Sequence, residues 1–586
     1  MCYDIVKIEK NGAVIVEKKP LPVGRKDIED VIERGCYYVD KTLFIKEIID
    51  SAAEVTLFTR PRRFGKTMNM YMLKRFFECD MDSKGEIIDH SKCFNGLKIM
   101  SAGEKYKEHM GKYPVIFLTL SGAKALTYKD CIRSLRNDIV NELVHHAYLL
   151  QSEKISEKEK EQFSYYYWEK TESDEEYTDA LLFLSSLLYK HHGLKPFILV
   201  DEYDVPLQNA MLNGFGKEMT SYIRRLFENV FKKNPYLGKG IITGCLRVAK
   251  ESIFTGMNNL KVCGIMNPTF SEYFGFTQKE VEEALKYYDI SDKLPAVKKW
   301  YDGYTFGKAE IYNPWSIIMF LEETVKDKVT IPKPYWANTS GNDILNRIME
   351  WSDEDSQVKK DLDSLLAGKT VTKTINDYLT YNQVDDTVEN VWSIMFHTGY
   401  LTMKQDLHDG RIELCIPNGE VLFAFERLIE QWFSVKASKN GEVQRNFCKA
   451  IAEGEAEVAE KIFSRFLKTT ISLRDTTTKS RKENFYHGML LGLLKYNAGW
   501  DVKSNVDSGL GYADIVLFDY DNELGIIIEV KYADSIYKME ESCHEALEQI
   551  NKNQYEEELL ENDITHTVRY GISCYKKKCR IMKIVD

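Results

Sequence analysis

The most constraining feature of the chain is the segment 57–67, in which an apolar run leads into a basic loop and then into Gly65, Lys66 and Thr67. A strand, a tight loop and a helix in that order predict a phosphate-binding loop, because backbone N–H groups of the loop and of the helix N-terminus face the anion. We expect Lys66 to reach the terminal phosphates of a nucleotide and Thr67 to supply a hydroxyl to Mg2+. Arg60 stands where the general G-x-x-x-x-G-K-[ST] pattern has its first glycine, so the motif is incomplete by itself.

The second half of such a site is an apolar strand that ends in acidic residues, and the segment 197–202 supplies one. We expect Asp201 to hold the Mg2+ shell and Glu202 to orient and deprotonate the attacking water. A later apolar run ends in Thr243, which we expect to sense the γ-phosphate. Arg247 follows it and is a candidate for stabilising transition-state charge, with a salt bridge to a surface acid as an equally weighted alternative.

Four short apolar runs predict buried strands, and helical patterns lie between them. They are residues 55–58, 115–120, 197–200 and 240–243. Strands that alternate with helices are typical of a parallel α/β sheet. We expect the run at 115–120 to supply a strand between the two motifs.

Charge and hydropathy exclude several classes of protein. The net charge is −11, so the surface as a whole does not attract nucleic acid, and any such contact requires a local basic patch. The N-terminal segment lacks the apolar core of a signal peptide, and no apolar run is long enough to span a bilayer. The 12 cysteines have no framework spacing and indicate reduced thiols, so we expect a cytoplasmic protein without membrane contact.

The chain beyond residue 270 changes character. A helix is predicted over 278–288 with Thr277 as its N-cap, and aromatic residues then crowd the segment 300–336. We interpret this region, 271–350, as a helical or winged-helix-like lid with a small aromatic core, in preference to a base-stacking surface. The segment 351–478 is a connecting region of unreadable role, with a hairpin predicted around residues 406–411.

A second candidate site lies near the C-terminus. Asp514 begins one predicted strand, and Glu529 and Lys531 lie at the end of the next, where a period of two places them on the same side. Two carboxylates can bind Mg2+, and a lysine can position water or stabilise developing negative charge. The alternative interpretation is that these charged residues lie at a solvated strand end. The apolar run 526–528, however, indicates a buried strand, where a charged side chain is costly unless it is paired or binds a metal.

The first domain resembles the AAA-ATPase-like proteins of bacteria and archaea, which are P-loop ATPases related to AAA+ and signal-transducing ATPases. The resemblance rests on the segments 35–42, 60–67, 201–204, 254–259 and 300–304. It implies that arginine is usual at position 60 and that residues 38–42 lie near the nucleotide base. The expected nucleotide-binding residues are Arg63, Phe64, Gly65, Lys66, Thr67, Asp201, Thr243 and Arg247.

Residues 484–575 resemble the PD-(D/E)XK nuclease superfamily, and the pairing of such a domain with this ATPase is itself characteristic of the AAA-ATPase-like family. The resemblance implies that Asp514 and Glu529 are metal ligands and that Lys531 is the catalytic lysine. Glu483 and Gln549 are candidate supports. His487 is more readily interpreted as a structural helix residue. One departure is Tyr512-Ala513 before Asp514, where relatives often carry an arginine, and this puts phosphate binding in doubt.

The predicted architecture is therefore α/β, with a P-loop ATPase parallel sheet and lid and a separate C-terminal restriction-endonuclease-like domain. The expected boundaries are 1–270 for the ATPase-like domain, 271–350 for the lid, 351–478 for the connecting region and 479–586 for the nuclease-like domain. ATP and Mg2+ are the expected cofactors, and nucleic acid, with DNA ranked first, is the expected partner. Homo-oligomerisation stays open.

Two functional hypotheses follow from this architecture. The first is a Mg2+-dependent nuclease that is regulated by ATP binding or hydrolysis. The alternative is an NTP-driven switch or interaction protein whose nuclease-like domain is catalytically inactive and only binds. A metabolic phosphotransferase is less favoured, because no acceptor site is evident.

Overall fold

The computed structural model describes most of the chain, and its contacts divide it into two units that we describe separately. Unit 1 comprises Met1–Ile344 and Thr372–Val421, and unit 2 comprises Leu345–Val371 and Leu422–Asp586. The residues described are 7–10, 13–16, 18–82, 84–168, 177–246, 253–254, 256–327, 331–336, 343–376, 379, 383, 386–438, 441–470, 479–495, 499–508, 511–553, 555, 559, 562, 564 and 566–585. The domain boundaries expected from the sequence stay predictions.

Unit 1 is built on a five-stranded parallel sheet in the order β6-β7-β8-β3-β9. Its strands are β3 (Val55–Thr59), β6 (Val115–Thr119), β7 (Phe197–Asp201), β8 (Lys239–Gly244) and β9 (Leu260–Cys263). The first four coincide with the apolar runs, because strands of a parallel sheet that is covered on both faces are apolar throughout. The prediction of a parallel α/β sheet is confirmed.

The sheet order corrects one expectation. The strand between β3 and β7 is β8, which comes later in the chain, whereas β6 lies at the edge beyond β7. Strand β9, which pairs with the other side of β3, was not predicted from the sequence. Only Cys263 of this edge strand is buried, so β9 lacks the continuous apolar run of the central strands.

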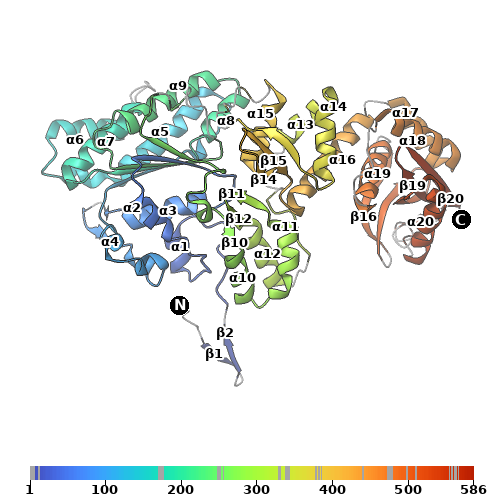
Figure 1. Ribbon diagram of the computed structural model, residues 1–586, viewed down its shortest axis with the longest axis horizontal. Coiled ribbons are helices and arrows are strands. Elements are labelled where there is room, and N and C mark those ends of the chain that lie inside the picture. Colours follow the sequence, from blue (N-terminus) through green and yellow to red (C-terminus); the bar gives the residue numbers. More distant parts are fainter. Residues whose placement is uncertain are drawn as a thin grey trace. The chain divides into compact units, whose positions relative to one another are not determined.

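Helices cover both faces of this sheet. In Figure 1, α5, α7 and α9 lie on one face and α1, α2 and α3 on the other. The helices up to β9 are α1 (Ile28–Glu33), α2 (Leu43–Asp50), α3 (Lys66–Phe77), α4 (Glu104–Lys107), α5 (Tyr128–His145), α6 (Glu157–Trp168), α7 (Tyr177–His192), α8 (Val205–Leu212) and α9 (Gly216–Phe227). Two small hairpins accompany them, β1 (Lys7–Lys10) with β2 (Ala13–Val16) and β4 (Asp80–Met81) with β5 (Ile87–Ile88).

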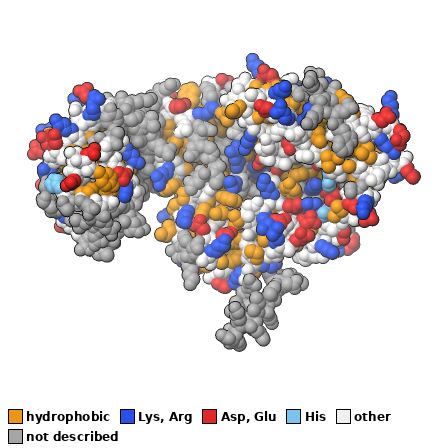
Figure 2. All heavy atoms as spheres, turned by 180° about the vertical axis from the view of Figure 1, so that it is seen from behind, with side chains coloured by type: hydrophobic (Ala, Val, Ile, Leu, Met, Phe, Trp, Pro, Cys, Tyr) orange, Lys and Arg blue, Asp and Glu red, His pale blue; other side chains and the backbone are white. Residues whose placement is uncertain are grey.

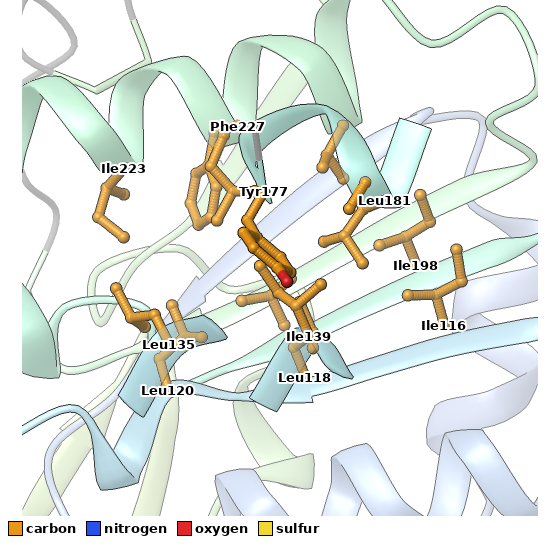
Figure 3. Close-up of a cluster of buried hydrophobic side chains, with 14 of the residues drawn as sticks. Ile116, Leu118, Leu120, Leu135, Ile139, Tyr177, Leu181, Ile198, Ile223 and Phe227 are labelled. Carbon is orange, nitrogen blue, oxygen red and sulfur yellow. The ribbon is translucent and has the colours of Figure 1, made fainter. Parts of the chain in front are cut away.

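The main core of unit 1 lies between the sheet and the helices α5, α7 and α9. Figure 3 shows Ile116 and Ile198 of the sheet facing Ile139, Tyr177 and Phe227 of those helices. Each of these side chains is at most 1% exposed. Burial of large apolar side chains contributes about 1.5–3 kcal/mol each, so this layer fixes the strand ends that carry the polar residues described below.

The aromatic region forms a second core in unit 1. Its elements are β10 (Phe276–Thr277), α10 (Gln278–Tyr287), α11 (Leu294–Tyr301), β11 (Tyr304–Phe306), β12 (Ala309–Tyr312) and α12 (Pro314–Asp327). Thr277 and Glu280 form a reciprocal capping box at the start of α10, which confirms Thr277 as the N-cap. Tyr301 of α11, Tyr312 of β12 and Tyr335 are buried in one hydrophobic cluster, so the predicted aromatic core is confirmed.

The middle of the chain contributes to both units. Its elements are α13 (Asp343–Glu354), α14 (Ser356–Leu366), β13 (Val371–Thr374), α15 (Val388–Thr398), β14 (Thr402–Asp406), β15 (Arg411–Cys415) and α16 (Gly419–Ser438). The hairpin expected around residues 406–411 is confirmed as β14 and β15, which pair antiparallel. Helix α16 begins in unit 1 and continues into unit 2.

Unit 2 contains a separate mixed sheet in the order β16-β17-β18-β19-β20, in which β18 and β19 are parallel and the other pairs antiparallel. Its strands are β16 (Trp500–Ser508), β17 (Gly511–Asp519), β18 (Leu524–Tyr532), β19 (His566–Tyr575) and β20 (Lys578–Val585). Its helices are α17 (Gly441–Ala452), α18 (Ala456–Thr470), α19 (Lys479–Leu494) and α20 (Met539–Asn553). The predicted separate α/β domain is confirmed, although the sequence analysis did not include β20, whose Lys and Arg residues interrupt its apolar positions.

Candidate nucleotide and metal sites

The phosphate-binding loop connects β3 to α3. Gly65 is the N-cap of α3 with a φ of 81°, a left-handed conformation that glycine adopts without strain. The turn directs the first N–H groups of α3 toward the loop, where they lack partners inside the helix. Arg63 also has a positive φ of 67°, and its guanidinium lies 3.9 Å from the ring centroid of Trp315. The strand, loop and helix therefore have the order and the backbone shape that an anion site needs.

Lys66 is buried inside this loop. Its side chain is directed back over the loop, where Nζ donates to the carbonyl oxygens of Arg60 at 3.0 Å and of Pro61 at 2.9 Å. The residue is 5% exposed. Backbone carbonyl oxygens of the loop thus hold the ammonium group of Lys66.

Asp201 brings the two sequence motifs together. It ends β7, is fully buried, and accepts a hydrogen bond from the hydroxyl of Thr67 at 2.7 Å. The hydroxyl of Thr243 donates to the other carboxylate oxygen. A carboxylate beside the α3 threonine is an oxygen donor set suited to Mg2+. The structure therefore places Thr67, Asp201 and Thr243 in one cluster at the carboxyl ends of β7 and β8.

Glu202 follows at the tip of β7, with a positive φ of 53°. Burial raises the pKa of its carboxyl above the ordinary value, and the negative charge of Asp201 adds to this shift. A strained backbone and a perturbed carboxyl next to a metal-type cluster are features typical of a functional position. Arg247 lies outside the described residues, so its expected role stays a prediction.

Arg60 does not face the phosphate loop. Its guanidinium is fully buried, donates to the carbonyl oxygens of Thr59 and Cys263 at 2.8 Å each, and lies between the rings of Phe274 and Phe306. Burial lowers its pKa to about 10. Arg60 thus connects β3, β9 and the aromatic region, which explains why a long side chain replaces glycine at this position.

Phe64 has a similar anchoring role. It is fully buried, with its ring centroid 4.9 Å from that of Tyr304 and 5.1 Å from that of Phe306. The structure therefore places this expected nucleotide-binding residue under the loop and not above it. An apolar residue between two charged arginines and a glycine was the sequence signal for this inward orientation.

A cavity of about 280 Å³ opens beside the start of α3. Its lining includes Tyr38, Val39 and Lys41 from the segment before α2, together with Gly65 and Met68. Lys41 donates to Glu280 at 2.6 Å and to the carbonyl oxygen of Glu272 at 2.7 Å, which joins this wall to α10. The segment expected near the nucleotide base thus lines a cavity next to the phosphate loop.

Two supporting residues, Asp204 and Trp336, lie in segments that the sequence singles out but have no role predicted from it. Asp204 is buried and accepts from the backbone N–H groups of Cys245 and Leu246 at 2.9 and 3.0 Å, so it holds the turn after β8. Trp336 donates from Nε1 to the carbonyl oxygen of Arg62 at 3.1 Å, within the phosphate loop. Both contacts join segments far apart in the chain, which a residue pattern does not reveal.

The second site lies where β17 and β18 separate. Their ladder begins at the pair Ile515 and Ile528, and beyond that pair the carboxylate of Asp514 accepts from the N–H of Val530 at 2.8 Å. Glu483 of α19 accepts in the same way from the N–H of Tyr532 at 3.0 Å. Two carboxylates thus replace ladder carbonyls along one edge of β18.

Glu529 and Lys531 complete this cluster. The Nζ of Lys531 contacts a carboxylate oxygen of Glu529 at 2.9 Å, and Glu529 is 2% exposed. Burial raises the pKa of Glu529 to about 7, and the nearby Asp514 reinforces the shift. Burial alone would lower the pKa of Lys531, but the charge of Glu529 outweighs it and raises the value.

The oxygen Oε2 of Glu529 is buried and receives no hydrogen bond from the residues that the structure describes. A buried carboxylate oxygen without a donor, close to a second carboxylate, fits the oxygen ligands that Mg2+ prefers. The structure therefore brings Asp514, Glu529 and Lys531 together, as the sequence pattern predicts.

The remaining candidates have other contacts. His487 Nε2 lies 2.9 Å from the backbone oxygen of Asp514, which agrees with a structural role beside the site. The amide of Gln549 donates to the hydroxyl of Tyr555 at 3.3 Å. Gln549 thus contacts Tyr555, whereas Glu483 contacts β18, the strand that carries Lys531.

The surface carries charges of both signs. On the face shown in Figure 2, Lys and Arg side chains are interspersed with Asp and Glu side chains. None of the helices in the described part of the chain has the length and hydropathy that crossing a bilayer requires. The cysteines that the structure describes are all free thiols.

Comparisons with known proteins agree with the two sites. Residues 22–254 match the family model described as predicted AAA-ATPase, and residues 481–584 match that of the PD-(D/E)XK nuclease superfamily. An uncharacterized protein in the vnfD 5' region of Azotobacter chroococcum mcd 1 is 23% identical over 423 residues, which cover 69% of each chain. The two family matches contain the phosphate loop with Asp201 and the cluster of Asp514, Glu529 and Lys531, respectively.

Proposed function

We propose that this chain, whose residues 22–254 and 481–584 match the models of a predicted AAA-ATPase and of the PD-(D/E)XK nuclease superfamily, is an ATP-hydrolysing protein whose C-terminal domain is a Mg2+-dependent nuclease under ATPase control. The observation that carries this proposal is the convergence of Asp514, Glu529 and Lys531 at the opening between β17 and β18. Two carboxylates that can hold Mg2+ and a lysine that can stabilise negative charge are groups that serve metal-dependent phosphodiester cleavage.

ATP binding is supported by the phosphate loop and the cavity beside it. Lys66 would exchange its carbonyl partners for phosphate oxygens, and the N–H groups at the start of α3 would bind the same anion. Thr67 and Asp201 would hold Mg2+, and Glu202 would position the attacking water. The cavity lined by Tyr38 and Val39 would receive the base.

In the nuclease-like domain, Asp514 and Glu529 would hold Mg2+, which supplies charge stabilisation and activates water when it is bound. Glu529 would bind it through the buried oxygen that lacks a hydrogen-bond donor among the described residues. Lys531 would then face the negative charge that develops on the scissile phosphate. Glu483 would keep this lysine in place by holding the backbone of Tyr532.

Regulation is supported by a chain of buried contacts from the phosphate loop to α16. Trp336 donates from Nε1 to Arg62 of the loop and from its backbone N–H to the fully buried Glu420 at 2.5 Å. Glu420 also accepts from the hydroxyl of Ser316 at 2.7 Å. Because Glu420 lies in the first turn of α16, which continues into unit 2, a movement of the loop on ATP binding would bias that helix.

We propose nucleic acid, and DNA in the first place, as the substrate, with the cytoplasm as the site of action. The mixed surface charge favours a local contact near the nuclease cluster over a broad electrostatic attraction. Assembly into homo-oligomers stays open, and gel filtration with and without ATP would address it.

The nuclease proposal is tested by incubating the full chain with plasmid DNA, linear DNA and RNA in Mg2+ or Mn2+. We expect metal-dependent cleavage that Lys531→Ala removes and that Lys552→Ala, an exposed lysine of α20, retains. Cleavage that persists in Lys531→Ala would contradict the assignment of this site.

The alternative function predicts a different pair of results. An NTP-driven switch with an inactive nuclease-like domain would hydrolyse ATP and would lose that activity in Lys66→Ala, but it would cleave none of the nucleic acids with either metal. A surface variant, Lys129→Ala on α5, serves as the control for the ATPase measurement.

A further inference from the structure

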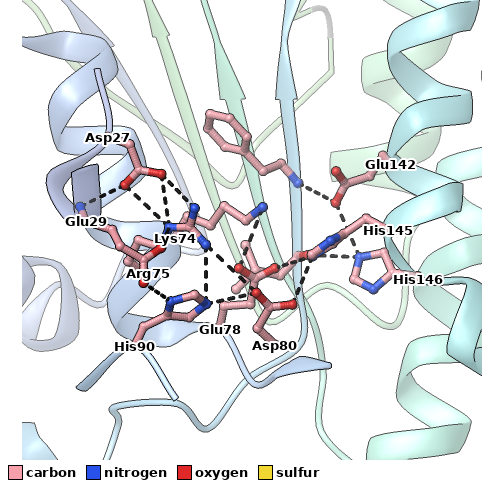
Figure 4. Close-up of polar contacts among 12 residues, drawn as sticks. Asp27, Glu29, Lys74, Arg75, Glu78, Asp80, His90, Glu142, His145 and His146 are labelled. Atoms are coloured by element: carbon pink, nitrogen blue, oxygen red, sulfur yellow. Dashed lines mark hydrogen bonds and ion pairs between the residues drawn. The ribbon is translucent and has the colours of Figure 1, made fainter. Parts of the chain in front are cut away.

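A cluster of histidine and carboxylate side chains lies at the end of α3 that is remote from the phosphate loop. Glu78 follows the last residue of α3, Asp80 begins β4, and His145 ends α5 (Figure 4). Helix α3 has 12 residues, so its axis separates the cluster from the phosphate loop by about 18 Å. The cluster therefore belongs to neither of the sites proposed above.

The geometry of the cluster is that of three ligands around one point. The Nε2 atom of His145 lies 2.8 Å from Oε1 of Glu78 and 3.5 Å from Oδ1 of Asp80. One nitrogen and two carboxylate oxygens all lie within 4.8 Å of one another. Ligands at about 2.0–2.2 Å from a metal are separated from each other by roughly 3–3.5 Å, so small side-chain movements would suffice.

A second observation points to a ligand at this place. Asp80 and Glu78 are only 4% and 2% exposed. Oδ1 of Asp80 and Oε2 of Glu78 are both buried, and neither oxygen receives a hydrogen bond from the described residues. The ammonium of Lys74 is 3.6 Å from Oε2 of Glu78, which is beyond hydrogen-bond length. His145 contacts Asp80 only through the 3.5 Å ion pair. Buried carboxylate oxygens normally have a donor or a metal.

The charge of the surrounding network favours a cation. In Figure 4, Arg75 and His90 face the acidic groups on the α1 side, and Lys74 faces Glu78. His90 is already engaged by both of its ring nitrogens, Nδ1 with Glu29 and Nε2 with Asp80. Among the residues labelled in Figure 4, the permanently charged bases are Lys74 and Arg75. They are outnumbered by the acidic residues, which are Asp27, Glu29, Glu78, Asp80 and Glu142.

We infer that Glu78, Asp80 and His145 form a structural site for a divalent transition metal, with Zn2+ as the ion that best fits the donors. One imidazole and two carboxylates are ligands of Zn2+, whereas Mg2+ prefers oxygen ligands alone. The metal would join the end of α3, β4 and the end of α5. It would thereby clamp the β6 edge of the sheet, because the neighbouring Glu142 of α5 accepts from the N–H of Phe117 in β6 at 2.8 Å.

The test uses Co2+ and Zn2+ with full-length protein that has been treated with a chelator. The background carries Asp514→Asn and Glu529→Gln, so that the nuclease cluster does not contribute, and no nucleotide is added. We expect about one equivalent of tightly bound metal, visible d–d absorption with Co2+, and a metal-dependent rise in the melting temperature of unit 1. His145→Gln and Asp80→Asn should each weaken binding by about 10-fold or more.

The matched control is His109→Gln, a half-buried histidine of unit 1 that contacts Tyr113 and should leave metal binding unchanged. A plain ion-pair network predicts that His145→Gln lowers the melting temperature without metal and that added Zn2+ stabilises neither protein. That outcome, or equal metal binding by His145→Gln and the parent, would overturn the inference. If His145→Gln does not fold, Asp80→Asn gives the same comparison with a nearly isosteric side chain.

Discussion

At the scale of single residues, Arg60 shows how the phosphate-binding loop departs from the general glycine pattern. Its side chain is buried between Phe274 and Phe306 and bonds two carbonyl oxygens of β3 and β9. The loop can do without a first glycine because the Cβ at this position is directed into the core and away from the phosphate. The missing glycine is therefore a packing feature and leaves Lys66 and Thr67 in place.

Truncation of Arg60 should affect stability and not nucleotide contact. We expect Arg60→Ala to lower the free energy of unfolding by about 3 kcal/mol, because it leaves a cavity and two carbonyls without their donor. Arg60→Met keeps most of the volume without the buried charge and should cost less than about 1.5 kcal/mol. Urea unfolding measures both. A loss of ATP affinity in folded Arg60→Met would show instead that the guanidinium contacts phosphate.

Asp201 is the residue on which the nucleotide cluster depends, since the hydroxyls of Thr67 and Thr243 both donate to it. Asp201→Asn keeps the shape but removes the charge that would hold Mg2+, so we expect ATP hydrolysis to fall by roughly 100-fold while metal-free nucleotide binding persists. Phosphate release assays and nucleotide titration measure the two quantities. Glu218→Gln, an exposed acid of α9, is the control, and an unchanged hydrolysis rate in Asp201→Asn would refute the role.

At the scale of elements, the apolar runs of the sequence predict the central strands well, because both faces of those strands are buried. The pattern fails at the edges. Only Cys263 of β9 is buried, and β20 alternates apolar residues with Lys and Arg. The order of the strands could not be predicted either, because no local sequence pattern indicates that β8, which comes late in the chain, lies between β3 and β7.

Site residues could be predicted where reactive side chains occur at a sequence spacing that local structure brings together. Asp514, Glu529 and Lys531 were found because a strand period of two and one hairpin suffice to bring them together. Trp336 was not, because its bond to Arg62 joins segments far apart in the chain through a tertiary contact. Long-range hydrogen bonds of this kind leave no periodic trace in a sequence.

The start of α16 is the element that we expect to carry information from the phosphate loop. Trp336→Phe removes the N–H that bonds Arg62 but keeps an aromatic ring, whose packing partner is Tyr400 at 5.2 Å. We expect basal DNA cleavage to remain and the effect of ATP on cleavage to be lost. Gly399 lies close to the same loop: its φ of 91° is a left-handed conformation that favours glycine, and a Cβ at this position would lie only 3.1 Å from Cβ of Pro61.

The control for this prediction is Trp351→Phe, a half-buried tryptophan of α13 that should keep the ATP response. Cleavage and ATP hydrolysis are measured on the same preparations. An unchanged ATP response in Trp336→Phe would exclude the Trp336–Glu420 route.

At the scale of the whole molecule, acid should destabilise unit 1 through His192. Burial lowers the pKa of this histidine to about 4, and the charges of His191, His146 and Lys154 add to the shift. Because this folded pKa lies below the unfolded value near 6.5, the contribution of His192 is complete above pH 6.5 and is lost as the pH falls toward 4.

We therefore expect the contribution of His192 to the free energy of unfolding of unit 1 to fall between pH 6.5 and 4, by at most about 1.4 kcal/mol per pH unit. His192→Gln retains an acceptor for the hydroxyl of Tyr148 and should flatten this dependence. His566→Gln, an exposed histidine of unit 2, should not. Denaturant titrations across this pH range measure the effect, and equal slopes for His192→Gln and the parent would rule out this source.

In the proposed function, nucleotide bound at Lys66 controls phosphodiester cleavage at Lys531. The most direct measurement is the rate of Mg2+-dependent DNA cleavage by the full chain, with and without ATP, compared between the parent protein and Lys66→Ala. We expect ATP to change the parent rate, Lys66→Ala to cleave at the ATP-free rate under both conditions, and Lys531→Ala not to cleave. An ATP effect that persists in Lys66→Ala, or cleavage by the parent that ignores ATP altogether, would contradict the proposed function.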